Sequence, residues 1–356
     1  MRVAFVAALV VAGSVLGSTF ALGGAPRNAY AVHRLVSDAA GRAPQVDRSL
    51  VNAWGLAASA TGPWWTSNEA SATSTLYSGA GSKQLLTVSV AGGPTGIVHY
   101  GGAGFPVAAA GRSGPARFVY ACEDGMIRAW TPTVPAGWST QSVVVVDEAA
   151  EAAVFRGIAI DGERIYATDF HNARVDVYDA RWHRVRRSGA FVDQSIPEWY
   201  APFGVQVLQG HVFVTYVWRA PVNGNDAPTG GYVDEFDRDG KLLARVARTG
   251  PLTAPWGIAL APRSFGRFGG DLLVGNFGDG RVNAFRRHRT GWSYDGALHD
   301  PKGRPLVVNG LWGLAFGNGS SAGPAGTLFF TSGPHDWRGA TELGVHGLLG
   351  SITAAR

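Results

Sequence analysis

The sequence predicts an all-β fold, a six-bladed β-propeller, and three observations support this prediction. The 356 residues include 50 glycines and 19 prolines and only 16% charged residues, so turns are frequent. No long stretch after residue 31 has the composition or the apolar spacing of a helix. One pattern also recurs six times, at intervals of roughly 40 to 60 residues, and this spacing is typical of propeller blades.

Each copy of the pattern begins with a glycine that introduces an apolar strand, and two further apolar runs follow. The glycines are Gly55, Gly96, Gly157, Gly204, Gly257 and Gly313. In the fifth copy, for example, "APWGIAL" is followed by "LLVGNFGDGRVNAF". Because each copy holds three or four strands, the six copies predict six blades.

The two ends of the chain predict how the ring closes. The sixth copy ends at "LLGSITAAR" and has no fourth strand of its own. The segment "AVHRLVSDA", residues 31–39, alternates between apolar and polar side chains and suits an outer strand. We therefore expect this N-terminal strand to complete the last blade and close the ring.

The first 31 residues predict export. An apolar run follows Arg2 and reaches about Leu22, and the triplet Ala29-Tyr30-Ala31 suits a signal-peptidase site before Val32. An uncleaved membrane anchor is the alternative. We expect residues 1–31 to be a secretory signal peptide and residues 32–356 to be the propeller, secreted or periplasmic and without stable membrane insertion after cleavage. Cys122 is the single cysteine, so no disulfide within the chain is expected.

The stretch "GNFGDG", residues 275–280, has the glycine spacing of a phosphate-binding loop. However, its pair Asp279-Gly280 aligns with Asp124-Gly125 and Asn172-Ala173 in other copies. Such pairs favour two-residue type I′ hairpin turns, whereas a phosphate loop leads directly into a helix. The sequence therefore predicts a turn between the second and third strands of the fifth blade.

The charge pattern argues against a nucleic-acid partner. The formal net charge is +5, but the charges are scattered and form no basic face. The run "RWHRVRR", residues 181–187, is interpreted as a solvated loop. A protein-interaction scaffold that uses outer loops such as 181–200 and 218–231 is one functional alternative.

Propeller geometry brings the residues that precede the six glycines to one face, around the mouth of the channel. These residues are Trp54, Thr95, Arg156, Phe203, Trp256 and Trp312. The aromatic rings either pack against each other's blades or form the walls of a pocket, in which Arg156 would bind an anionic group. The first functional hypothesis is therefore that a small aromatic or anionic ligand binds at the channel mouth, with Tyr216 as a further contact.

The ends of the second strands meet on the same face. The residues there are Asn68, Ala121, Asp169, Tyr216, Asn276 and Ser332. Asn68, Asp169 and Asn276, with the nearby Glu123, either form a Ca²⁺ site or cap their own turns. With His171 beside Asp169 as a general base, the rival hypothesis is a cation-dependent hydrolase or lyase, lactonase-like or esterase-like. No cofactor is required by the first hypothesis, and Ca²⁺ is the cofactor that the rival hypothesis would use.

Several segments resemble a known family. They are "LVNAWGLA", "STLYSG", "GGPTGIV", "DFHNARVDVYD", "AFVDQSIPEWYAPFGVQ", "GPLTAPWGIALAP", "LLVGNFGDGRVNAF" and "NGLWGLAFGNG". The chain is similar to secreted bacterial proteins of uncharacterised function that are predicted to be NHL-like propellers, some with a C-terminal sorting tail. The resemblance implies the propeller fold and export, and it implies no catalytic residue. This chain ends at "SITAAR", so simple export is expected rather than sorting.

Overall fold

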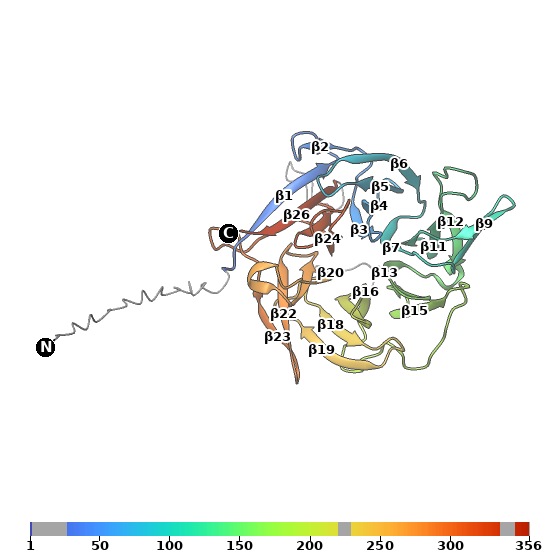
Figure 1. Ribbon diagram of the computed structural model, residues 1–356. Coiled ribbons are helices and arrows are strands. Elements are labelled where there is room, and N and C mark those ends of the chain that lie inside the picture. The colour runs from blue at the N-terminus through green and yellow to red at the C-terminus, as the bar shows by residue number, and fades with distance from the viewer. Residues whose placement is uncertain (2–26, 220–228, 335–345, 356) are drawn as a thin grey trace.

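In the computed structural model, the strands form a ring around a central axis (Figure 1). The structure describes Met1 and residues 27–219, 229–334 and 346–355. The helices in these ranges are two short 3₁₀ turns, Ala149–Glu151 and Gly266–Phe268, and neither is long and apolar enough to cross a membrane. The predicted all-β six-bladed propeller is therefore confirmed.

Four blades are four-stranded sheets whose strands follow one another from the axis outward. Blade 1 holds β3 (Ala53–Ala58), β4 (Trp64–Asn68), β5 (Thr73–Tyr77) and β6 (Lys83–Ser89). Blade 2 holds β7 (Pro94–His99), β10 (Phe118–Cys122), β11 (Met126–Trp130) and β12 (Val143–Asp147), with the hairpin β8 (Pro106–Ala109) and β9 (Arg112–Pro115) inserted after β7. Blade 4 holds β16 (Tyr200–Leu208), β17 (His211–Trp218), β18 (Tyr232–Phe236) and β19 (Leu242–Arg248). Blade 5 holds β20 (Pro255–Leu260), β21 (Leu272–Asn276), β22 (Val282–His288) and β23 (Gly291–Ala297).

Blades 3 and 6 depart from this plan. Blade 3 is a three-stranded sheet of β13 (Phe155–Asp161), β14 (Arg164–Asp169) and β15 (Arg174–Asp179). Blade 6 holds β24 (Leu311–Phe316), β25 (Leu328–Ser332) and β26 (Leu348–Ala354), and it gains β1 (Tyr30–Ser37) and β2 (Gln45–Val46) from the N-terminus. Among the described residues, blade 3 is therefore the blade whose outer edge has no fourth strand.

The N-terminal strand closes the ring, as predicted. β1 pairs antiparallel with β26, from Tyr30 opposite Ala354 to Ser37 opposite Leu348. The ring of Tyr30 is fully buried, and its hydroxyl donates to the carbonyl of Phe265, 3.1 Å away. Cleavage before Val32 stays a prediction, and a cut at that point would remove the first two residues of β1.

The repeated glycines allow the inner strands to approach one another around the axis. A Cβ atom at Gly313 would lie 2.7 Å from the carbonyl oxygen of Trp54, and one at Gly204 would overlap the carbonyl oxygen of Trp256. In both cases the obstructing group is the backbone of the next blade, which cannot move aside. Glycine is therefore required where adjacent inner strands converge.

Hydroxyl side chains link consecutive blades at the same level, and we call these contacts the hydroxyl clasps. The side chains are Ser67, Thr168 and Thr331, near the ends of β4, β14 and β25, and each hydroxyl donates to a backbone carbonyl of the next blade. In blade 6, the amide of Gly313 donates to the Thr331 hydroxyl at 2.9 Å, and that hydroxyl donates to the carbonyl of Trp54 in blade 1. This clasp joins the last blade to the first beside the axis.

The predicted hairpin after β21 is confirmed, but the prediction that its turn is of type I′ is wrong. In the three aligned pairs, the second residue alone has a positive φ: 79° at Gly125, 52° at Ala173 and 69° at Gly280. A type I′ turn needs positive φ at both central residues. The connections are longer than two residues, and the Gly280 amide closes a wider turn on the Asn276 carbonyl at 3.0 Å.

Candidate functional site

The structure brings the predicted aromatic residues together at one end of the channel, where they pack against each other. We call this group the aromatic plug; its members are Trp54, Phe170, Phe203, Trp256, Phe277 and Trp312. The Trp54 and Trp312 rings stack with centroids 3.4 Å apart, and Trp256 meets both edge-on. Trp54, Phe203 and Trp312 are at most 4% exposed, whereas Trp256 is partly exposed. Trp256 is thus the predicted wall residue that retains surface for a ligand.

The channel itself is narrow. Its cavity of about 40 Å³ is lined by residues from the inner strands of all six blades, including Gly55, Gly96, Gly257 and Gly313. At roughly 10 to 15 Å³ for each water, it has room for about three water molecules. An organic ligand is larger than this cavity.

Arg156 lies against the plug and already has an anionic partner. Its guanidinium forms an ion pair with Glu123, and its terminal carbon lies 5.5 Å from the ring centroids of Trp54 and Phe170. The Trp256 indole donates to the Arg156 carbonyl at 3.1 Å. An anionic ligand at this mouth would therefore compete with Glu123 for the guanidinium.

The strand register places the expected residues at the second-strand ends, with one difference. Ala53 pairs with Asn68, Phe155 with Asp169 and Pro255 with Asn276. In blade 2, the residue opposite Pro94 at this position is Cys122. The equivalent residue in blade 2 is thus Cys122, and the prediction of Ala121 is wrong by one position.

Asn68, Asp169 and Asn276 form hydrogen bonds within their own blades. Asn68 donates to the Thr75 hydroxyl at 2.9 Å, Asp169 accepts the side-chain amide of Asn172 at 2.7 Å, and Asn276 donates to the Pro251 carbonyl at 2.8 Å. Asp169 also accepts the backbone amide of Asn172 at 3.2 Å, which is the contact of a turn cap, whereas Asn68 and Asn276 bond to a neighbouring strand and to a loop. Within the described ranges, no three His, Cys, Asp or Glu side chains are grouped as a metal site would require.

The remaining predicted residues do not form a catalytic pair. Asp169 forms an ion pair with Arg174 at 3.1 Å, while His171 is exposed and its carbonyl accepts from Arg219. Tyr216 is buried on β17, and burial raises the pKa of its hydroxyl well above the usual range. The structure thus leaves His171 without a contact to the Asp169 carboxylate among the described residues.

A larger pocket opens at the other ends of the inner strands, between blades 4 and 5, and we call it the interblade pocket. Its volume is about 550 Å³. Its apolar wall includes Leu208, Phe213, Leu260, Trp292 and Phe316, and its polar side chains include His211, Arg263 and Arg287. An apolar cavity with a few polar groups is the usual form of a small-molecule site.

A buried carboxylate orients the polar side of this pocket. Glu235 on β18 has no exposed surface, and it accepts from the His211 Nδ1, the Arg287 guanidinium and the Trp292 indole, the last at 2.9 Å. Burial opposes ionisation, but hydrogen bonds from these three side chains, Arg287 foremost, hold the pKa of Glu235 below its usual value. In the neutral tautomer of His211 that donates from Nδ1 to this carboxylate, Nε2 is an acceptor.

Sequence reasoning missed this pocket because its polar residues are dispersed. His211 and Glu235 are 24 positions apart, and Glu235 and Arg287 are 52 positions apart. The three residues come from two blades and do not recur in the other copies of the pattern. The isolated Trp292 among the exposed residues of β23 is the one local signal for the pocket.

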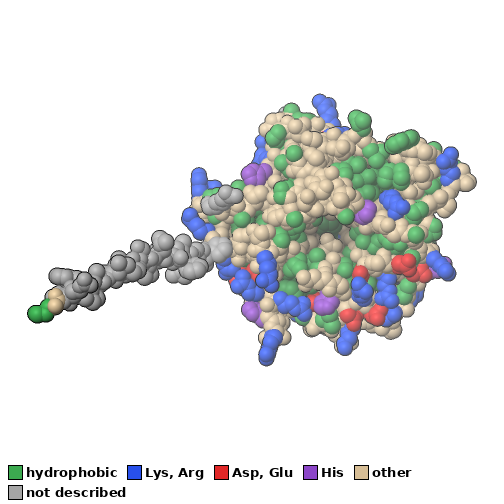
Figure 2. Space-filling view, in the orientation of Figure 1, with side chains coloured by type: hydrophobic (Ala, Val, Ile, Leu, Met, Phe, Trp, Pro, Cys, Tyr) green, Lys and Arg blue, Asp and Glu red, His purple; other side chains and the backbone are tan. Residues whose placement is uncertain are grey.

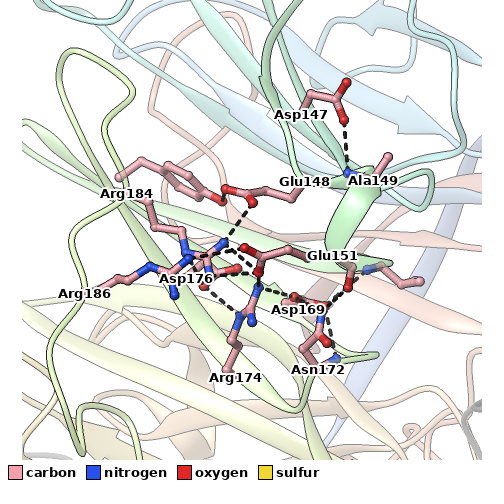
Figure 3. A network of polar contacts seen from close by, with 12 residues as sticks. Asp147, Glu148, Ala149, Glu151, Asp169, Asn172, Arg174, Asp176, Arg184 and Arg186 are labelled. Carbon is pink, nitrogen blue, oxygen red and sulfur yellow. Dashed lines mark hydrogen bonds and ion pairs between the residues drawn. The ribbon is translucent and has the colours of Figure 1, made fainter.

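The segment 181–187 packs against the open edge of blade 3, so its interpretation as a solvated loop is wrong for Arg184. That side chain is 10% exposed and forms ion pairs with Glu148 at 2.8 Å and Glu151 at 3.0 Å (Figure 3). The Val185 amide also donates to the Val177 carbonyl on β15 at 2.7 Å. The segment lies there because blade 3 has no fourth strand to occupy that edge.

The comparisons with known proteins identify relatives of unknown function. No family model matches the chain. "Uncharacterized protein R648" of Acanthamoeba polyphaga mimivirus is 30% identical over 345 residues, which cover 92% of this chain and 82% of that protein. "Uncharacterized protein L690" of the same virus is 30% identical over 308 residues, covering 82% and 80%. The chain therefore belongs to the family of these proteins, and these relatives are viral rather than bacterial.

Solved structures support the fold alone. The soluble aldose sugar dehydrogenase of Escherichia coli is 12% identical with a TM-score of 0.53, and the match covers 92% of this chain and 100% of that chain. The aldose sugar dehydrogenase of Streptomyces coelicolor, solved in its PQQ-bound form, is 16% identical with a TM-score of 0.51, covering 92% and 99%. At such low identity a shared propeller does not transfer an activity.

Proposed function

We propose that this member of the R648 and L690 family binds a small organic ligand that carries a ring and an acidic group, and that it does so in the interblade pocket. The observation that carries the proposal is the combination of an apolar wall with His211, Arg263 and Arg287 in one cavity of about 550 Å³. Cavities of roughly 300 to 1,000 Å³ hold typical small ligands.

The geometry supports an orientation for this ligand. The Trp292 ring lies edge-on to Phe213, with centroids 5.9 Å apart, and offers an apolar surface for the ligand ring. The Arg287 guanidinium lies over Trp292 at 5.1 Å from its centroid, and Arg263 lines the same cavity. The two guanidinium groups would bind the acidic group, and the Nε2 of His211 would accept a proton donor.

The channel mouth is the alternative location for the ligand. Trp54, Phe203, Trp312 and Tyr216 are buried and offer little surface, so a ligand there would use Trp256 and Arg156. It would also need to displace Glu123 from Arg156. These requirements make the interblade pocket the better supported location.

Ligand screening distinguishes the two locations. We expect small ring-bearing carboxylates, such as benzoate and its hydroxylated derivatives, to raise the melting temperature because they bind the native state alone. Arg263→Ala should weaken the binding of the best compound by about tenfold, the loss of one charge-assisted contact. Trp256→Ala is the matched control and should leave this affinity unchanged. Loss of binding in Trp256→Ala and retention in Arg263→Ala would place the ligand at the channel mouth.

Hydrolysis is a second candidate function, and the His211 and Glu235 pair favours it. An ionised carboxylate that accepts a hydrogen bond from Nδ1 allows Nε2 to take a proton from a water molecule. The oxygen of that water would then attack an ester or lactone carbonyl. The competing arrangement for hydrolysis uses His171 as the base and a Ca²⁺ ion. The ion would be bound by Asn68, Glu123, Asp169 and Asn276. Turnover of simple lactones and nitrophenyl esters, compared between His211→Ala and His171→Ala and with and without Ca²⁺, separates the two. Equal rates in all variants would remove both.

We also propose that the protein is exported. The apolar stretch after Arg2 supports this proposal, although residues 2–26 lie outside the described residues. The mass of the protein recovered from the culture medium would give the cleavage site. Protein partners are the remaining alternative; of the loops considered for them, 181–200 is described and residues 220–228 lie outside the described residues.

A further inference from the structure

The open edge of blade 3 borders a second pocket, which we call the arginine groove. Its volume is about 390 Å³, and its floor includes Val175, Asp176 and Val177 of β15. The segment 184–191 forms one wall, and residues from the turns of blades 3 and 4 form the other. In Figure 2, basic and acidic side chains gather on the rim of the ring where Figure 1 shows β15.

Six guanidinium groups and two carboxylates line this groove. The arginines are Arg164, Arg174, Arg184, Arg186, Arg187 and Arg238, and the acids are Asp176 and Asp239. Glu148, Glu151 and Asp161 pair with some of these arginines but do not line the groove. Each of the six arginines thus has an acidic partner, and guanidinium groups outnumber carboxylates on the surface that a bound molecule would contact.

The outer arginines retain hydrogen-bond donors. The Arg186 and Arg187 side chains are 72% and 49% exposed, and each forms one ion pair, with Glu151 at 3.2 Å and Asp239 at 3.0 Å. A guanidinium has five N–H donors, so each arginine still has several to offer. By contrast, the Arg184 and Arg174 side chains are held at the Glu151 carboxylate (Figure 3).

A buried acceptor lies on the floor of the groove. Asp176 is 4% exposed, and its Oδ1 accepts from the Nε of Arg174 at 3.0 Å and forms an ion pair with the Nε of Arg184 at 3.3 Å. Its other oxygen, Oδ2, accepts no hydrogen bond in the described part of the chain. Buried carboxylate oxygens normally have a donor, so this oxygen would accept a hydrogen bond from a hydroxyl group of a bound molecule or from a water that bridges to one.

We infer that the arginine groove binds an acidic saccharide, a hydroxylated sugar ring with a carboxylate or sulfate group. Arg186 and Arg187 would bind the acidic group, because planar guanidinium groups match the two oxygens of such an anion. A sugar hydroxyl would supply the donor that Asp176 lacks, and Val175 and Val177 would contact the apolar face of the ring. This site is separate from the interblade pocket, which lies between blades 4 and 5.

Calorimetric titration of the whole protein with trigalacturonate tests the inference. We expect saturable binding that weakens with added salt, because guanidinium contacts to an exposed anion are screened. The double variant Arg186→Ala with Arg187→Ala should bind at least tenfold more weakly. Arg112→Ala, an exposed arginine on β9 away from the groove, is the matched control and should bind as the parent does.

Further ligands define the chemistry. Monomeric galacturonate shows whether one sugar acid is enough for binding or a chain is needed. A sulfated disaccharide tests sulfate in place of the carboxylate. Maltotriose tests a sugar without an acidic group. Asp176→Asn should lower the affinity for galacturonate several-fold, with the melting temperature as the check on its fold. Equal affinity for inorganic sulfate and the saccharides, equal affinity for maltotriose, or an unchanged affinity in the double variant would each overturn the inference. Arg263→Ala should bind trigalacturonate as the parent protein does. The titration therefore tests the arginine groove even if no ligand binds in the interblade pocket.

Discussion

The two ends of the inner strands use aromatic side chains in different ways. At one end, the residues before the repeated glycines meet on the axis and bury one another, as the 3.4 Å stacking of Trp54 on Trp312 illustrates. At the other end, Trp292 is half-buried beside a cavity and contacts Arg287 and Glu235. The aromatic residues that recur in the copies of the pattern thus stabilise the ring by packing together. Trp292, which occurs in one blade, lines a pocket.

The largest expected effect is at the centre of the aromatic plug. Trp312 is 2% exposed and stacks between Trp54 and Phe277, so Trp312→Ala should lower the free energy of unfolding by about 3 to 5 kcal/mol. Trp292→Ala, the comparison on the other side of the ring, should cost about 1 to 2 kcal/mol because its ring is only partly buried. Urea denaturation measures both. Equal losses would mean that the two regions do not differ in role.

The sequence predicted those features of the fold that recur in every blade. Gly55, Gly313 and their equivalents recur because the backbone of each neighbouring blade leaves no room for a Cβ, and this steric demand is the same in every blade. The closing strand followed from the alternation in residues 31–39. The missing fourth strand of blade 3 concerns a single blade, so the repeat could not reveal it.

The candidate sites were less predictable for a related reason. The ring positions of Trp54 and Asn276 were correctly placed, but whether their side chains face a ligand or each other depends on packing across the axis. The contact of Glu235 with Arg287 joins strands of adjacent blades at a separation that matches no motif. Such contacts depend on the angle between blades, which a single sequence does not contain.

Ring closure should have the next largest effect. Tyr30 is fully buried, and its ring stacks on Phe268 with centroids 6.0 Å apart. A chain that begins at Val32 should therefore be less stable by about 3 kcal/mol than one that begins at Arg27, which keeps this aromatic contact. Thermal denaturation of the two proteins provides the comparison. Equal stability would show that the first two residues of β1 are dispensable and would leave cleavage before Val32 compatible with the fold.

The hydroxyl clasp between blades 6 and 1 should have an intermediate effect. Thr331→Val keeps the shape of the side chain but leaves the buried Gly313 amide and the Trp54 carbonyl without this partner, which costs about 1 to 3 kcal/mol. Thr87→Val on the partly exposed β6 is the control and should change the free energy of unfolding by less than about 0.5 kcal/mol. If the two substitutions had similar effects, the clasp would not stabilise the ring.

The pH dependence of stability should reveal the Glu235 contacts. Because the pKa of Glu235 is lowered in the folded protein, its stabilising effect is present above the pKa of an unfolded glutamate, about 4.3, and is lost as the pH falls through the folded value. Glu235→Gln should therefore be less stable than the parent protein near pH 7, and the difference should shrink below about pH 4.3. A difference that does not change with pH would mean that the charge of Glu235 contributes nothing.

The smallest expected effect concerns Ca²⁺ at the plug end of the channel. The side-chain oxygens of Asn68 and Asp169 already accept hydrogen bonds within their own blades, so they would have to leave those contacts to bind an ion. We therefore expect EDTA, and separately excess Ca²⁺, to shift the melting temperature by less than about 1 °C. An ion held at 100 times its dissociation constant would instead add about 2.7 kcal/mol of stability. A shift of that size, abolished by Asp169→Asn, would establish the calcium site and return the hydrolase hypothesis to the plug end.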